Sequence, residues 1–226
     1  MVRRAEDLFS DADRATIAAA IAEAERETAG EIVPVVATAS GRYDRAEDLF
    51  GLVVALAALA GVWLAFQGVE PATGAWAVGH DVRIGLPLLL VTVVVAFALG
   101  TALAARFPVL ALPFVRPREM VEEVERAAFA AFHHFRVRRT AAGTGILIYV
   151  SLYERRVFVL GDDVVSARLT FGDWDDVRDA VLRGLRAGRP TDGLCGGIRA
   201  AGRRLAEHFP PSQGDTNEIG NDLRLV

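Results

Sequence analysis

Two long apolar segments without a charged residue constrain the fold of this chain more than any other feature. They run from Leu49 to Phe66 and from Ile84 to Ala105. As helices they would be roughly 27 and 33 Å long, close to the ~30 Å hydrocarbon core of a bilayer. The alternative is a helical hairpin buried in a soluble core, but a chain of 226 residues would hardly cover both helices on all sides. The sequence therefore predicts a transmembrane hairpin.

Neither apolar segment contains an ionisable side chain, so the hairpin offers no proton relay, ion path or transport site. Gly51, Gly61 and Gly100 would let the two helices approach each other closely. We therefore interpret the hairpin as an anchor in the lipid bilayer.

The arginines that flank the two segments predict which way the hairpin faces. Five lie on the side of the chain ends and one lies in the connecting loop: Arg42, Arg45, Arg106, Arg116 and Arg118 against Arg83. Because arginine-rich flanks stay in the cytoplasm, both termini are expected there. No apolar stretch follows the first arginines, so we expect no cleavable signal peptide. The sequence thus predicts a two-span protein of the cell (inner) membrane with a cytoplasmic folded domain.

The residues before the hairpin predict one helix and one strand, which are too few to form a core alone. The helix begins at Ser10, which forms a predicted capping box with Asp13, and Gly30 is placed to end it. A β-branched run follows at residues 31–39. Its Pro34 favours an edge strand or a bulge.

The residues after the hairpin predict the remainder of the same domain. They indicate a helix, two strands and two further helices, at residues 117–134, 144–152, 156–160, 173–187 and 192–208. The strand at 144–152 is apolar on both faces, which suits a central strand covered by helices on both sides. It is expected to pair with the strand at 31–39. We therefore predict one α/β domain, formed by residues 1–45 and 116–226 and interrupted by a hairpin at 46–115.

Three segments resemble the TPM domain, a family named for thylakoid-lumen, photosystem-repair and acetylcholine-receptor-modulating members. They are "SDADRATIAAAIAEAERETAGEIVPVV" at 10–36, "GTGILIYVSLYERRVFVLGDD" at 143–163 and "VRDAVLRGLRAGRPTDGLCGGIRAAGRRLAEHFP" at 177–210. Their order is similar to that in bacterial TPM-domain membrane proteins with a hairpin inserted after the first strand. Those proteins also often end in a tail much like "NEIGNDLRLV".

The resemblance implies a small α/β sandwich with helices on both sides of a short sheet. Some members of the family act as partners of membrane complexes, and acid-phosphatase activity and divalent-cation binding have been attributed to others. The chain departs from the family pattern after its second hairpin strand, where Asp162 and Asp163 are followed by no small residue. The main expectation is therefore a protein-interaction or assembly module that binds a membrane or cytoplasmic protein. The alternative is a weak divalent-metal-dependent phosphatase.

Carboxylates bracket the loop that follows the second hairpin strand: Asp162, Asp163, Asp173, Asp175 and Asp176. Oxygen ligands of this kind suit Ca²⁺ or Mg²⁺, and the predicted metal ligands are Asp162, Asp163, Asp173 and Glu31. The alternative is helix capping. Asp173, Asp175 and Asp176 lie at a predicted helix N-terminus, where each negative charge is favoured by about 0.3–1 kcal/mol.

No catalytic arrangement stands out in the sequence, which has no nucleophile elbow, phosphate loop or zinc spacing. Cys195 has no base beside it in the sequence that would lower its pKa. His133 and His134 are adjacent, so on a helix they point about 100° apart and suit C-terminal capping better than metal binding. The net charge of −4 gives no basic excess for nucleic-acid binding.

Overall fold

The computed structural model describes residues 4–66, 85–140, 142–211 and 217–226. The chain divides into two compact units: Arg42–Arg116, and Val2–Gly41 together with Pro117–Val226. We call the first the hairpin unit and the second the α/β domain. The α/β domain is thus built from two parts of the chain that the hairpin unit separates.

The hairpin unit contains α2 (Asp44–Phe66), α3 (Leu86–Arg106), η1 (Pro108–Leu110) and η2 (Leu112–Phe114). The α/β domain contains α1 (Asp11–Glu25), β1 (Ile32–Ala37), α4 (Pro117–His134), η3 (Val137–Arg139), β2 (Ile146–Ser151), β3 (Arg156–Gly161), α5 (Asp163–Ser166), η4 (Phe171–Trp174), α6 (Asp175–Arg186), α7 (Pro190–His208) and β4 (Arg224–Leu225).

The sheet of the α/β domain has four strands in the order β3-β2-β1-β4. β1 is parallel to β2, with Ile32 opposite Ile146, and is parallel to β4 on its other side. β2 and β3 form an antiparallel hairpin. The predicted pairing between the strands on either side of the hairpin unit is therefore confirmed.

The edge position predicted for β1 is wrong, because β1 lies between β2 and β4. Val36 O accepts a hydrogen bond from Val226 N at 3.0 Å, and Thr38 N donates to Val226 O at 2.9 Å. The backbone polar groups of even-numbered residues in β1 therefore point toward β4. The backbone of Pro34 also faces β4, and proline has no N–H to donate. However, β4 pairs only with Val35 and Val36, so no hydrogen bond from residue 34 is needed. The proline is tolerated because the short β4 does not reach it.

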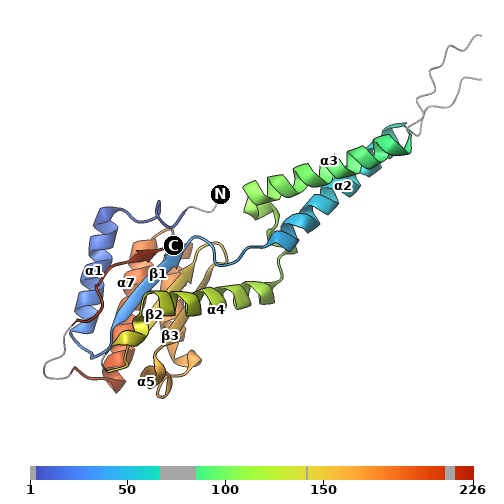
Figure 1. Cartoon of the computed structure of the whole chain (residues 1–226). Helices are drawn as coiled ribbons and strands as arrows, with labels where there is room; N and C mark the ends of the chain where they lie inside the picture. Colours follow the sequence, from blue (N-terminus) through green and yellow to red (C-terminus); the bar gives the residue numbers. More distant parts are fainter. Residues whose placement is uncertain (1–3, 67–84, 141, 212–216) are drawn as a thin grey trace, which may run out of the picture. The chain divides into compact units, whose positions relative to one another are not determined.

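Helices cover both faces of the sheet, as the alternation of side chains along β1 requires. Ile32 and Val36 pack in the cluster that also holds buried residues of α1, α6 and α7. Val33 and Val35 point to the opposite face and pack with buried residues of α4. Figure 1 shows the sheet with α4 across one face and α1 and α7 on the other. The fold is mixed α/β, as predicted.

The first helix begins as predicted and ends earlier. Ser10 and Asp13 form the capping box of α1, with Ser10 N donating to Asp13 Oδ2 at 2.9 Å. The helix ends at Glu25, so Gly30 does not end it. A Cβ atom on Gly30 would lie 2.8 Å from Leu205 Cδ1 and 3.3 Å from the Thr144 carbonyl oxygen. The glycine therefore serves the close packing of the entry to β1 against α7.

Candidate functional site

The two helices of the hairpin unit are long and apolar enough to cross a membrane. Only 11% of the most apolar stretch of each helix is buried within the structure, unlike the core helix of a soluble protein. Leu49 and Phe66 lie in α2 and Ala105 lies in α3, whereas Ile84 falls outside the described residues. Within the part of the chain that the structure describes, the apolar side chains of both helices are thus largely uncovered.

Small residues form the contact between α2 and α3. A Cβ atom on Gly100 would lie 2.9 Å from the Cα atom of Gly51 and 3.0 Å from the Cβ atom of Val54. Ala55, Ala96 and Ala104 are buried as well. Packing of this kind holds helices together where the surrounding medium is as apolar as the side chains.

Two of the four predicted metal ligands meet at one arginine. Arg138 Nε lies 3.5 Å from Asp162 Oδ1, and Arg138 Nη2 forms an ion pair with Asp163 Oδ2. Asp162 is buried, and its Oδ1 accepts a hydrogen bond from Asp163 N at 2.7 Å at the start of α5. In this structure Asp162 therefore caps a short helix and shares a counter-ion with Asp163.

Asp173 acts as a capping residue in a different segment. Its Oδ2 accepts hydrogen bonds from Thr170 N at 2.7 Å and from Thr170 Oγ1 at 2.8 Å. These bonds lower the pKa of Asp173, with the bond from the Thr170 side chain as the largest cause. Asp175 and Asp176 lie in the first turn of α6. The capping interpretation is confirmed for Asp173, and Asp175 and Asp176 lie at the helix N-terminus as predicted.

Glu31 lies at the same end of the sheet as Asp162, but on the opposite side of β2. Ile146 N donates to Glu31 O at 2.8 Å, and Asp162 N donates to Gly145 O at 2.9 Å. A Cβ atom on Gly145 would lie 2.9 Å from Val137 Cγ1, so Val137 covers the sheet between the two acids. The predicted ligands therefore do not meet in one place, and a cation bound by them stays a prediction.

The Glu31 carboxylate holds the C-terminal segment instead. Its Oε1 accepts a hydrogen bond from Glu218 N at 3.0 Å and its Oε2 accepts one from Ile219 N at 3.3 Å. Glu25 on α1 acts in a similar way on the chain entering β1, since its Oε1 accepts a hydrogen bond from Ile32 N at 2.9 Å. Both carboxylates are therefore tied to backbone donors.

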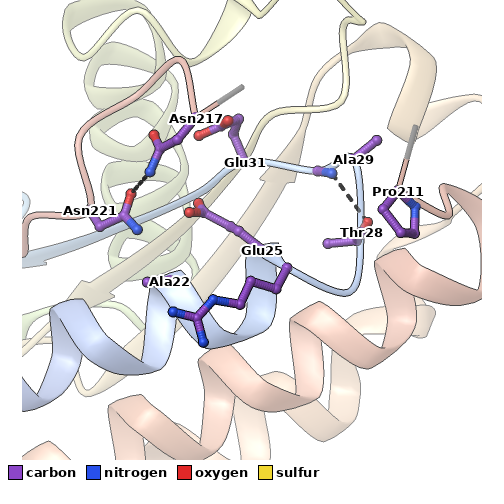
Figure 2. Close-up of a pocket in the computed structure, with 10 residues that line it drawn as sticks. Ala22, Glu25, Thr28, Ala29, Glu31, Pro211, Asn217 and Asn221 are labelled. Atoms are coloured by element: carbon purple, nitrogen blue, oxygen red, sulfur yellow. Dashed lines mark hydrogen bonds between the residues drawn. The ribbon is translucent and has the colours of Figure 1, made fainter. Parts of the chain in front are cut away.

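A pocket of about 400 Å³ lies beside these two carboxylates. Figure 2 shows the carboxylates of Glu25 and Glu31 near the side-chain amides of Asn217 and Asn221, which bond to each other. The pocket thus presents carboxylate and amide oxygens, the donor atoms that Ca²⁺ and Mg²⁺ prefer. Glu31 was predicted from the sequence as a ligand, but its three neighbours were not, because they lie on α1 and on the C-terminal tail.

A network of hydroxyl groups and one carboxylate lies at the other end of the sheet and was not predicted from the sequence. Ser151 Oγ donates to Glu154 Oε2, and Ser40 Oγ donates to Ser151 Oγ at 2.8 Å. The Tyr149 hydroxyl lies 3.1 Å from Ser40 Oγ. Since Ser40 gives its only proton to Ser151, Tyr149 is the donor of that contact. Burial raises the pKa of Tyr149, with a smaller opposing effect of the bond to Ser40, so the phenol keeps its proton.

Cys195, His133 and His134 lie where the structural interpretation of each residue placed it. Cys195 is buried, and burial raises the pKa of its thiol, which makes it a poor nucleophile. His133 and His134 occupy the last turn of α4. Within the described residues, no group of three or more His, Cys, Asp or Glu side chains is placed to hold a metal ion.

Comparisons with known proteins bear on the fold alone. No protein-family model matches the chain, and no curated protein matches it. Among solved structures, it is similar to the NMR structure of the BA42 protein from the psychrophilic bacterium Bizionia argentinensis. The TM-score is 0.57 and the sequence identity 18%, over 98% of this chain and 97% of that chain. This similarity indicates a shared fold and carries no activity to this chain.

Proposed function

We propose that the chain is a membrane-anchored, TPM-like protein whose α/β domain serves as a protein-interaction or assembly module at the inner membrane. The observation that carries the proposal is the exposure of α2 and α3. These helices are long enough to span a bilayer and are only 11% buried over their apolar stretches. A lipid bilayer would remove this surface from water.

The assignment to the TPM family rests on the order of the three sequence segments. The arrangement of helices on both faces of a short sheet agrees with that assignment. In the proposed protein, the hairpin is an insertion between β1 and α4, so the domain is attached to the bilayer through two chain crossings.

An interaction role is supported by an aromatic group on the surface of the domain. The ring centroids of Phe129 and Phe158 are 6.5 Å apart, and those of Phe158 and Phe171 are 5.4 Å apart. Phe129 is 46% exposed and Phe171 is 56% exposed. Exposed aromatic rings are enriched at sites where proteins bind one another. A protein that co-purifies with the wild-type chain from solubilised membranes should be lost with Phe171→Asp, and retention of that protein would exclude this surface.

The orientation of the hairpin follows from the five-to-one arginine count across its two sides. We expect a reporter that is active only outside the cytoplasm to stay silent when fused after Val226. The same reporter fused near Gly74, in the connection between the two helices, should be active. The opposite pattern of activities would place the α/β domain outside the cytoplasm.

The pocket at Glu25 and Glu31 favours one second candidate, a weak divalent-metal-dependent phosphatase using Mg²⁺ or Ca²⁺. Two carboxylates beside two side-chain amides provide oxygen ligands. The purified protein should then hydrolyse a phosphomonoester only when one of these ions is added, and Glu31→Gln should reduce the rate. Equal rates with and without the ions would leave the interaction module as the remaining proposal.

A further inference from the structure

The point where the chain leaves the sheet for α2 is held by side-chain hydrogen bonds. Glu154, in the turn between β2 and β3, is buried. Its Oε1 accepts hydrogen bonds from Ser40 N at 3.0 Å and from Gly41 N at 3.2 Å, and its Oε2 accepts one from Ser151 Oγ. All of these groups belong to the α/β domain, whose first part ends at Gly41.

The backbone supports the same attachment. Leu152 N donates to Ala37 O and Tyr153 N donates to Thr38 O, each at 3.0 Å. These two bonds extend the ladder between β1 and β2 beyond the last strand residues. The carboxylate of Glu154 then continues the attachment over Ser40 and Gly41, where the ladder has ended.

Arg155 shows how the turn presents this carboxylate. Its φ of 52° lies in the left-handed region, which is uncommon for a residue with a side chain. The turn therefore adopts a less favourable backbone conformation while Glu154 faces the departing chain.

We propose that Glu154, Ser151, Ser40 and Tyr149 form a clasp that fixes the exit of the chain toward the hairpin unit, and that the clasp opens without unfolding of the domain core. Residues 38–41 are held at the rim of the sheet by polar contacts, and Thr38 also donates from its N to Val226 O and accepts at Oγ1 from Ala5 N, each at 2.9 Å. Ile32, Val36 and Ile148 in the core pack on other elements. Opening therefore removes few buried apolar contacts, which is typical of segments that unfold locally.

Opening of the clasp would lengthen the free chain between the domain and the bilayer. Release of residues 38–41 adds four residues, or roughly 14 Å of reach at 3.3–3.6 Å per residue. This consequence depends on the proposed membrane anchor, whereas the clasp itself depends only on contacts within the α/β domain. The device would set how far the domain can extend to a partner.

Limited trypsin digestion of the full chain in detergent micelles tests the clasp, because Arg42 lies directly after it and is exposed. Cleavage after Arg42 requires its neighbours to leave their folded conformation. Glu154→Gln removes the charge that strengthens three hydrogen bonds, so this cleavage should become on the order of tenfold faster or more. Cleavage after Arg186, at the exposed end of α6, should change by less than about twofold because the core persists.

Tyr149→Phe is the matched control, since it removes a hydroxyl from the far end of the network and leaves the carboxylate in place. Its effect on cleavage after Arg42 should be smaller than that of Glu154→Gln. Hydrogen exchange provides a second readout, in which the amides of Ser40 and Gly41 should lose protection in Glu154→Gln while those of α7 keep theirs. Two results would overturn the proposal: unchanged protection at residues 40–41, or equal acceleration at every site with loss of cooperative unfolding.

Discussion

A fragment of residues 117–226 should fail to fold cooperatively, because it lacks β1. Ile32, Val33, Val35 and Val36 are each at most 2% exposed and pack on both faces of the sheet. Complete burial of such a side chain contributes about 1.5–3 kcal/mol. Loss of all four would therefore remove roughly 6–12 kcal/mol of burial free energy. The whole free energy of unfolding of a typical domain is about 5–15 kcal/mol. Removal of β1 also leaves β4 without its partner strand and exposes the edge of β2.

The matched control for this fragment keeps β1 and omits the hairpin unit. In this version a short Gly/Ser linker replaces residues 42–116, so that both parts of the α/β domain are present. It should give a single cooperative thermal transition by circular dichroism, whereas the fragment should give none or should aggregate. An equally cooperative transition in the fragment would show that β1 is not part of the core.

Val94→Arg should abolish or strongly reduce integration into the membrane. Val94 lies near the middle of α3 and is 66% exposed, so an arginine there would point away from the protein. A charge at the centre of a spanning helix costs about 2.5–3.5 kcal/mol on insertion scales. At 1.4 kcal/mol per factor of ten, this is on the order of a hundredfold in the insertion equilibrium. Membrane fractionation after expression measures the effect.

Val94→Leu is the control, because it preserves the apolar surface of α3 and should fractionate like the wild type. Normal integration of the Val94→Arg protein, with Val94→Leu unchanged, would mean that this face of α3 does not meet lipid. The folded domain should remain intact in both variants, since Val94 belongs to the hairpin unit.

Local patterns in the sequence predicted most elements of the fold. Runs of apolar residues located β2 and β3, and Pro117 marked the start of α4. The capping box at Ser10 marked the start of α1. These features depend on neighbouring residues, so one sequence is enough to find them. β4 was missed because it has only two residues and gains its strand conformation from pairing with β1.

The candidate site was less accessible to sequence analysis, because its contacts join distant parts of the chain. Glu31 bonds to residues 218 and 219, which are 187 and 188 positions away. Glu154 bonds to Ser40 across 114 positions, and its neighbours in the sequence do not distinguish it from an ordinary turn residue. The carboxylates of Asp162 and Asp173 resembled metal ligands in the sequence, but in the structure they cap short helices. Spacing along the chain does not distinguish these two uses of a carboxylate.

Alkaline carbonate extraction of the full-length chain from isolated membranes tests the central claim most directly. Carbonate releases proteins held by charge or by other proteins, but it does not release chains whose apolar helices lie in the lipid core. We expect the wild-type protein to remain in the membrane pellet, because extraction would expose the apolar side chains of α2 and α3 to water. Recovery of the wild-type chain in the carbonate wash, folded and free of lipid, would contradict the account of α2 and α3 as a membrane anchor.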